Sequence, residues 1–243
     1  MTHAPITERT TDQPDTVVET EQLIGATLIV GVISAVIALV LFNWLAREML
    51  RGATADFDGL IRNTLNGLAS DGLTRVMRYA SRFGGPTWLS VAGVAVVLGF
   101  LVKRWYRGVV LVVVTFGGAW LLDVILKHTF ERTRPEPFFG VPLPGSYSFP
   151  SGHALFAFVF FGTFAVLLVQ RLKGHPVRIL IWTVAGLLVA LIGISRVHLG
   201  VHYPSDVIAG YLSALVWVVV VGVVDRMASH GVFKRWLLKR RKA

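Results

Sequence analysis

Two histidines, an arginine and an aspartate lie within the short stretch SRVHLGVHYPSD, which runs from Ser195 to Asp206. Long apolar runs flank this stretch at residues 187–194 and 207–224. Charged and titratable side chains are unfavourable close to the hydrocarbon of a bilayer, so their presence at such a position indicates a functional site. The question is which ligand or reaction these side chains serve.

Two further segments carry residues of the same kind. KHTFERTRP contains Lys127 and Arg134, and FPSGHALF opens an apolar run at Ser151 and Gly152. The three segments together supply three cations, two histidines and one carboxylate, namely Lys127, Arg134, Arg196, His153, His202 and Asp206.

The residue types in these segments fit a phosphoryl group. Three fixed cations suit a dianion, and the planar fork of arginine adds bidentate geometry. A helix that begins at Ser151 directs free backbone N–H groups outward, and Gly152 allows an oxygen to approach the backbone closely. The two histidines and the acid indicate transfer of the phosphoryl group as well as binding.

Long apolar helices must position these residues. Hydrophobic residues make up 54% of the 243-residue chain and charged residues only 16%, whereas a soluble domain carries roughly 25% charge. Apolar runs occur at residues 23–42, 86–102, 108–126, 154–169, 179–194 and 207–224. Since a membrane-spanning helix needs about 20 residues, we expect the shorter runs to be extended or tilted. The sequence predicts an all-α integral membrane protein, a six-transmembrane-helix bundle over residues 23–225.

The first connection contains a further helical pattern. Apolar residues between positions 61 and 80 follow helical spacing, which predicts an interfacial helical segment between spans one and two. Arg75, Arg78 and Arg82 either anchor this segment at the headgroups or attract an anionic lipid, and simple anchoring is favoured.

The basic residues predict the orientation of the chain. The connections KRWYR and QRLKGHPVR and the basic tail at 226–243 fall on one side, together with the acidic leader at 1–22. The positive-inside rule makes this side cytoplasmic, so both termini are expected there and the three polar segments on the periplasmic side of a bacterial inner membrane. The leader is predicted to be disordered and not to be a cleaved signal peptide.

The net charge of +10 is explained by the membrane topology. Basic residues in such a chain set orientation and contact anionic lipids, so no nucleic-acid partner is predicted. The chain has no cysteine, which excludes disulfides and thiolate metal sites.

The three segments together resemble a family signature. The patterns K-x6-RP, PSGH and SR-x5-H-x3-D are similar to those of the type 2 phosphatidic acid phosphatase and vanadium haloperoxidase superfamily, and all three are complete. The resemblance covers about residues 86–224. It implies an integral membrane lipid phosphatase that requires no metal and no cofactor; haloperoxidases of the family are soluble, which disfavours that activity.

The resemblance also implies a role for each matching residue. His202 would be the nucleophile that forms a phosphohistidine, and Asp206 would accept the other ring N–H of His202. His153 would protonate the leaving oxygen and then activate water. The phosphate oxygens would be held by Lys127, Arg134, Ser151, Gly152 and Arg196.

Two residues near these motifs have alternative interpretations. His198 is interpreted as a packing or supporting residue, because a zinc pair with His202 would lack the glutamate and third ligand of an H-E-x-x-H site. Asp123 lies one helical turn before Lys127. It either orients Lys127 or is a solvated carboxylate near a cavity.

The sequence leaves the substrate open among lipid phosphates. Undecaprenyl diphosphate is favoured narrowly over phosphatidylglycerophosphate and phosphatidate, which carry the same phosphoryl end on an acyl or prenyl tail. A lipid phosphotransferase with the same intermediate, or a non-catalytic phospholipid binder or transporter, are the alternatives. The oligomeric state is not predicted.

Overall fold

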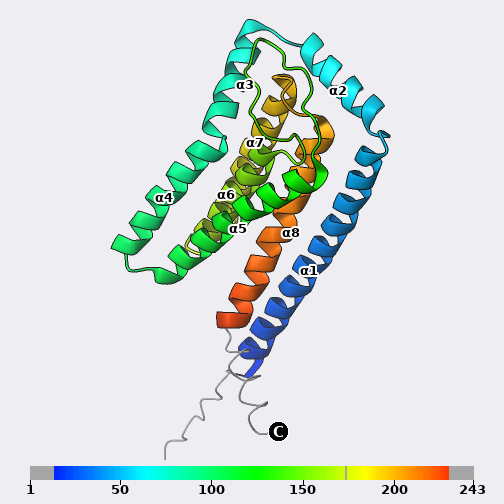
Figure 1. Ribbon diagram of the computed structural model, residues 1–243. Helices are drawn as coiled ribbons and strands as arrows, with labels where there is room; N and C mark the ends of the chain where they lie inside the picture. The colour runs from blue at the N-terminus through cyan, green and yellow to red at the C-terminus, as the bar shows by residue number, and fades with distance from the viewer. Residues whose placement is uncertain (1–13, 173, 230–243) are drawn as a thin grey trace, which may run out of the picture.

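The computed structural model describes residues 14–172 and 174–229, and the regular elements in these residues are all α-helices (Figure 1). The helices are α1 (Pro14–Leu50), α2 (Ala55–Gly67), α3 (Asp71–Phe83), α4 (Pro86–Val102), α5 (Tyr106–Phe130), α6 (Gly152–Val169), α7 (His175–His198) and α8 (Pro204–Ser229).

Most of these helices are long and apolar enough to cross a membrane. Five spans meet this description within the described part of the chain: 28–50 of α1, α5, α6, α7 and 204–228 of α8. The helices α3 and α4 qualify only as a pair, bent by 48° at the break between them. The molecule is therefore an integral membrane protein, with five candidate spans in the described residues, or six if the bent pair is one span; the predicted count of six stays a prediction.

Several helices are longer than the apolar runs that predicted them. α5 continues to Phe130, α7 continues to His198, and α8 already begins at Pro204. Proline is favoured in the first turn of a helix, where its missing N–H has no intrahelical partner in any case. The extensions place parts of all three polar segments on helix ends, which are more rigid supports than loops.

The two ends of the chain differ in part from the prediction. α1 begins at Pro14, so residues 14–22 of the predicted disordered leader are helical. α8 continues through residues 226–229 of the predicted tail. The remaining parts of the leader and the tail, residues 1–13 and 230–243, lie outside the described residues.

α6 lies at the centre of the bundle. It packs against α4, α5, α7 and α8, and half of its membrane-spanning window is buried. The core around it is formed by Leu89, Ala119, Leu155, Phe156, Ala157, Val159, Ile192 and Ala214. α8 approaches the start of α6 at Gly210, where an added Cβ would lie only 2.7 Å from the Ser151 carbonyl oxygen. This close approach holds the beginnings of α6 and α8 together.

α2 and α3 lie at the same end of the bundle as the loop between α5 and α6 (Figure 1). α3 packs against α7, and α2 contacts α7 and α8. Two arginines tie this pair to the loop: Arg62 donates to the Glu136 carbonyl (2.8 Å), and Arg78 donates to the Phe139 carbonyl (2.9 Å). The helical part of the predicted interfacial segment is thus observed, while its position at the headgroups stays a prediction.

Candidate active site

The three polar segments meet at one end of the bundle. Lys127 lies in the last turn of α5, Gly152 begins α6, Arg196 lies in the last turn of α7 and Asp206 lies in the first turn of α8. His202 lies in the short connection between α7 and α8 and is only 1% exposed. Helix ends far apart in sequence therefore bring the predicted residues to one place.

The two ring nitrogens of His202 have different partners. Nδ1 lies 3.3 Å from Asp206 Oδ2, and Nε2 lies 3.0 Å from Arg134 Nη1. Because a guanidinium only donates hydrogen bonds, Nε2 must accept this one and the ring proton must be on Nδ1. This tautomer donates to Asp206 and leaves the Nε2 lone pair directed at a cation.

The surroundings of His202 favour the neutral ring. Burial lowers the pKa of His202 from 6.5 to about 3, and the charges of Arg196 and Arg134 act in the same direction. Asp206 opposes this change. Its effect is limited because the same carboxylate is already paired with Arg132.

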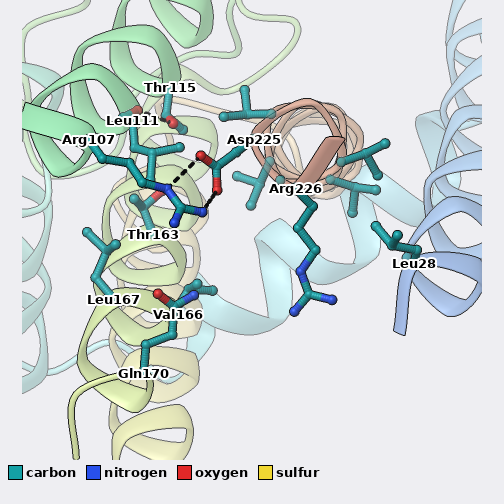
Figure 2. Close-up of a pocket in the computed structure, with 16 residues that line it drawn as sticks. Leu28, Arg107, Leu111, Thr115, Thr163, Val166, Leu167, Gln170, Asp225 and Arg226 are labelled. Carbon is teal, nitrogen blue, oxygen red and sulfur yellow. Dashed lines mark hydrogen bonds and ion pairs between the residues drawn. The ribbon is translucent and has the colours of Figure 1, made fainter. Parts of the chain in front are cut away.

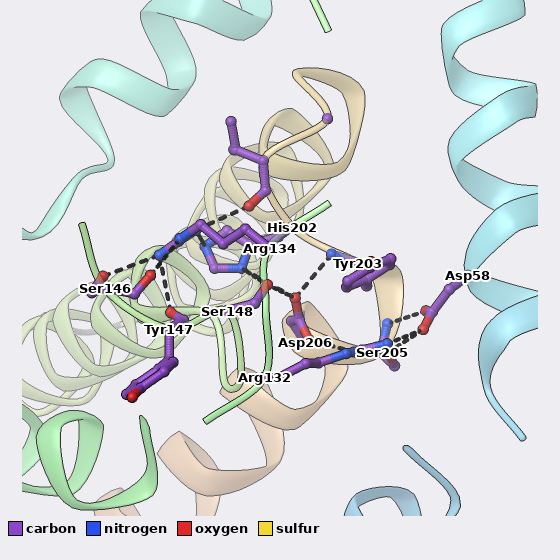
Figure 3. A network of polar contacts seen from close by, with 12 residues as sticks. Asp58, Arg132, Arg134, Ser146, Tyr147, Ser148, His202, Tyr203, Ser205 and Asp206 are labelled. Carbon is purple, nitrogen blue, oxygen red and sulfur yellow. Dashed lines mark hydrogen bonds and ion pairs between the residues drawn. The ribbon is translucent and has the colours of Figure 1, made fainter. Parts of the chain in front are cut away.

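The Asp206 carboxylate is fully buried and receives several hydrogen bonds (Figure 3). Its Oδ1 accepts from Arg132 Nη1 at 2.6 Å, and its Oδ2 accepts from Ser148 Oγ at 2.5 Å and from the Tyr203 backbone N–H at 2.9 Å. Such donors hold a carboxylate in its ionised form and in one orientation. Arg132 and Ser148 were not predicted as site residues, although Arg132 lies inside the K-x6-RP motif and Ser148 lies two positions before the PSGH motif.

Arg132 also contacts a second buried carboxylate. Asp58 of α2, which is 1% exposed, accepts from Arg132 Nη2 at 2.8 Å. The same carboxylate accepts from the backbone N–H (2.9 Å) and the hydroxyl (2.7 Å) of Ser205, the residue before Asp206. No sequence signal pointed to Asp58, because a single aspartate in a polar connection is ordinarily solvated.

Lys127 is held by Asp123. Its Nζ lies 2.7 Å from Asp123 Oδ2, and both side chains are largely buried. An added Cβ on Gly152 would lie 2.9 Å from Asp123 Oδ1 and 3.1 Å from Lys127 Nζ. Of the two interpretations of Asp123, the structure supports the one in which it orients Lys127, and it explains why glycine begins α6.

Arg134 and Arg196 are bound by neutral groups. Arg134 donates to the carbonyls of Ser146 (2.7 Å), Val201 (2.9 Å) and Tyr147 (3.1 Å), and Arg196 donates to the Ser81 hydroxyl. No salt bridge joins either guanidinium to a carboxylate within residues 14–172 and 174–229. Their positive charge is therefore available to an anion.

Three buried polar atoms at the site also have no hydrogen-bond partner among the described residues. They are Ser151 Oγ, Arg196 Nε and Asp123 Oδ1. Buried polar atoms are nearly always satisfied, so the two unsatisfied donors, Ser151 Oγ and Arg196 Nε, indicate a place where an anion can bind. Both of these residues belong to the predicted phosphate-binding set.

His153 lies in the first turn of α6, at the junction of α3 and α4. Its Nε2 would be 3.1 Å from a Cβ added to Gly85. The side chains of His202, Arg196, Arg134 and Lys127 are near enough to interact with it electrostatically. The structure thus brings the second predicted histidine to the same cluster.

His198 has contacts with residues outside this cluster. Its Nε2 lies 3.1 Å from Thr74 Oγ1, and its ring stacks on Phe139 at a centroid distance of 5.4 Å. Since His198 and His202 have separate partners, the geometry does not support a zinc pair. Within the described ranges, no group of three or more His, Cys, Asp or Glu residues is placed to hold a metal ion.

A cavity of about 320 Å³ lies at the other end of the bundle, between α1, α5, α6 and α8 (Figure 2). It is mostly apolar, and the Arg107–Asp225 ion pair lies at its wall with an Nη2–Oδ2 distance of 2.6 Å. None of the predicted site residues lines this cavity. The cavity is therefore separate from the polar cluster.

Comparison with known proteins identifies relatives of this chain. Residues 108–228 match the PAP2 superfamily. Phosphatidylglycerophosphatase B of Bacillus subtilis is 33% identical over 160 residues, which cover 64% of this chain and 77% of that protein. An undecaprenyl-diphosphatase of Sulfolobus acidocaldarius is 32% identical over 155 residues, covering 61% and 65%.

A solved crystal structure has a fold similar to that of this chain. The crystal structure of a transmembrane PAP2 type phosphatidylglycerolphosphate phosphatase from Bacillus subtilis aligns with a TM-score of 0.71 and 29% sequence identity. The alignment covers 79% of this chain and 96% of that one.

Proposed function

Because this chain belongs to the PAP2 superfamily, we propose that it is a membrane-embedded phosphatase that hydrolyses a lipid phosphate or diphosphate through a phosphohistidine intermediate. The family predicted from the three polar segments is confirmed by the match over residues 108–228. The observation that carries the proposal is the pairing of His202, whose Nδ1 faces Asp206 while Nε2 faces a cation.

The first step forms the phosphoenzyme. The Nε2 lone pair of His202 attacks phosphorus, the bond from phosphorus to the leaving oxygen breaks, and His153 donates a proton to that oxygen. The His202 ring becomes cationic, and the hydrogen bond from Nδ1 to Asp206 stabilises this charge. Arg134, which donates a hydrogen bond to Nε2, moves its donors to the phosphoryl oxygens.

The second step releases phosphate. His153, now neutral, accepts a proton from water as the water oxygen attacks phosphorus, and the bond from His202 Nε2 to phosphorus breaks. The first step has released the lipid alcohol, or the lipid monophosphate when the substrate is a diphosphate. The second step releases inorganic phosphate and returns His202 and His153 to their starting protonation states. No metal or cofactor takes part in the proposed steps.

The cations stabilise the charge that is spread over the equatorial oxygens during transfer. Phosphoryl transfer depends mainly on positioning and electrostatic stabilisation. Lys127, Arg134 and Arg196 supply the charge, and Ser151 Oγ and the Gly152 N–H supply neutral donors at the start of a helix. The unsatisfied Ser151 Oγ and Arg196 Nε support this assignment, because a phosphoryl oxygen would complete both hydrogen bonds.

Different observations support undecaprenyl diphosphate and phosphatidylglycerophosphate as the substrate. The sequence interpretation favours undecaprenyl diphosphate, and one relative carries the name undecaprenyl-diphosphatase. The relative that aligns over 77% of its length, and the similar crystal structure, carry names for phosphatidylglycerophosphate. Phosphatidate is the third candidate, and a comparison of rates decides among them.

The proposed site faces the periplasmic side of a bacterial inner membrane, with both termini in the cytoplasm. The polar cluster lies at one end of the bundle. The basic connections at 103–107 and 170–178 join helices at the opposite end. The positive-inside rule places these connections in the cytoplasm.

Release of inorganic phosphate tests the function. Protein purified in detergent is supplied with undecaprenyl diphosphate, phosphatidylglycerophosphate or phosphatidate, in the presence of EDTA. The wild type is expected to release phosphate and His202→Ala is expected to release none. His175→Ala, an exposed histidine at the other end of the bundle, serves as the matched control and is expected to behave as the wild type.

The outcome that contradicts the proposal is a folded wild type that releases no phosphate from any of the three lipids. Release that persists in His202→Ala would contradict the phosphohistidine route while leaving a phosphatase. If EDTA abolished the release of phosphate, the reaction would require a metal ion, and the proposed metal-free steps would be wrong.

A further inference from the structure

We propose that Asp58 is a positioning residue for the reaction, which acts through Arg132 and Ser205 on the carboxylate that supports the nucleophile. The inference rests on the proposed function, because it concerns the charge and orientation of Asp206 during phosphoryl transfer. Asp58 lies on α2, outside residues 108–228 that match the family.

The contacts form a continuous path from α2 to the nucleophile (Figure 3). Arg132 bridges the two carboxylates, with Nη2 at 2.8 Å from Asp58 Oδ2 and Nη1 at 2.6 Å from Asp206 Oδ1. Asp206 Oδ2 then lies 3.3 Å from Nδ1 of His202. Each link is a hydrogen bond between charged or potentially charged groups.

Ser205 provides a second path between the same residues. Its backbone N–H and hydroxyl both donate to Asp58, at 2.9 and 2.7 Å, and its Oγ accepts from Arg132 Nη1 at 2.7 Å. Asp58 thereby caps the first turn of α8 from outside that helix. Since Ser205 directly precedes Asp206, this contact fixes the backbone from which the Asp206 side chain projects.

The guanidinium of Arg132 is itself restrained in its plane. It lies 3.9 Å from the centroid of the Tyr203 ring, and Tyr203 also donates its backbone N–H to Asp206. The planar guanidinium of Arg132 contacts both carboxylates and the Tyr203 ring at once, so its orientation is fixed. The ammonium group of a lysine could not make the same bidentate contact. The network therefore fixes Asp206 in position as well as in charge.

The charges of the network suit a cation on His202. Asp58 and Asp206 carry two negative charges, and Arg132 carries one positive charge. Arg62 lies near enough to both carboxylates to interact with them electrostatically. The His202 ring becomes cationic when it is phosphorylated, and negative charge nearby stabilises that state. Removal of Asp58 makes these surroundings more positive by one unit, so this stabilisation would be weakened.

The substitution Asp58→Asn tests the proposal, with Asp56→Asn as the matched control. Asp56 is an aspartate on the same helix, but its side chain is exposed. We expect Asp58→Asn to lower kcat on the order of 10-fold, by analogy with the loss on removing an outer hydrogen-bond partner of a metal-ligating histidine. KM should change little because Asp58 does not contact the phosphoryl site, and Asp56→Asn should retain wild-type values.

A double variant separates a positioning role from general destabilisation. Asp206→Asn removes the carboxylate through which Asp58 acts, so adding Asp58→Asn to it should cause no further loss of kcat. A structural defect would instead reduce kcat by the same factor in both backgrounds. The thermal unfolding temperature of each variant is recorded in the same detergent.

Arg132→Lys provides a second test that does not depend on Asp58→Asn folding. It keeps the positive charge between the two carboxylates but loses the fork that bridges them, so kcat should fall with KM little changed. Wild-type kcat in either Asp58→Asn or Arg132→Lys would overturn the proposal. Failure of the proposed function is distinguishable, because the wild type itself would then release no phosphate.

Discussion

The state of His202 before substrate binds has a measurable consequence for stability. Burial and the nearby guanidiniums lower the pKa of His202 to about 3, whereas the histidine of an unfolded chain titrates near 6.5. The folded protein thus keeps His202 neutral between these values while the unfolded protein protonates it. Because the unfolded state binds the additional proton, the folded state is destabilised as the pH falls from about 6.5 towards about 3.

The size of this effect follows from the linkage of proton binding to unfolding. Each pH unit within the window changes the free energy of unfolding by about 1.4 kcal/mol. Lowering the pH from about 7.5 to about 4.5 crosses roughly two units of the window, so His202 alone removes roughly 2–3 kcal/mol of stability. For a chain of this length, that corresponds to roughly 5–10 °C in Tm.

The variant His202→Asn isolates this contribution. Asparagine retains an N–H that can donate to Asp206, but it does not titrate in this range. Thermal unfolding in one detergent is measured for both proteins across the interval. The wild type should lose roughly 5–10 °C more in Tm than His202→Asn, and His175→Asn, which changes an exposed histidine, should follow the wild type.

Parallel Tm curves for the wild type and His202→Asn would refute the reasoning. Such a result would mean that His202 has the same proton affinity in the folded and unfolded states. A wild type that gains stability at low pH relative to the variant would show that the Asp206 carboxylate outweighs burial. The Arg132–Asp206 pair would then be too weak in solution to limit the effect of Asp206.

Two glycine pairs give further predictions, each with an internal control. Gly152→Ala directs a Cβ at the ion pair between Asp123 and Lys127. We therefore expect kcat/KM in the phosphate-release assay to fall by roughly 10- to 100-fold. Gly145→Ala meets no atom within 4 Å, so kcat/KM should not change. Gly118→Ala places a Cβ against the Trp217 ring and should lower stability by roughly 1–3 kcal/mol. Gly117→Ala meets no atom within 4 Å and should not lower Tm. Equal behaviour of the two members of either pair would contradict the packing described for it.

The site was predictable to the extent that its residues lie in short motifs. Lys127, Arg134, Arg196 and Asp206 lie at or near the ends of apolar runs, so an alternating bundle places them at one end. His202 was separated from His198 by the family signature that this segment resembles, SR-x5-H-x3-D, and the structure gives the two rings different partners. The motifs together with the family resemblance were sufficient for these residues.

The supporting residues were not predictable in the same way. Asp58 meets Arg132 across 74 positions of sequence, and Ser81 meets Arg196 across 115. Neither Asp58 nor Ser81 lies in a pattern that distinguishes it from a solvated residue, and only the packing of α2 and α3 over the helix ends brings them to the site. The predicted second span began at residue 86, which is where α4 begins. The sequence did not show that α3 and α4 could together form one span bent by 48°.

The measurement that tests the central claim most directly is trapping of the phosphoenzyme. Lipid phosphate labelled in its terminal phosphoryl group is mixed with the protein, the reaction is quenched within a fraction of a turnover, and the label bound to protein is mapped. We predict an acid-labile, base-stable label on His202 that is absent from His202→Ala and present in His175→Ala. A wild type that turns over the lipid while the label is found on another residue, or on none under conditions that stabilise phosphohistidine, would contradict the account.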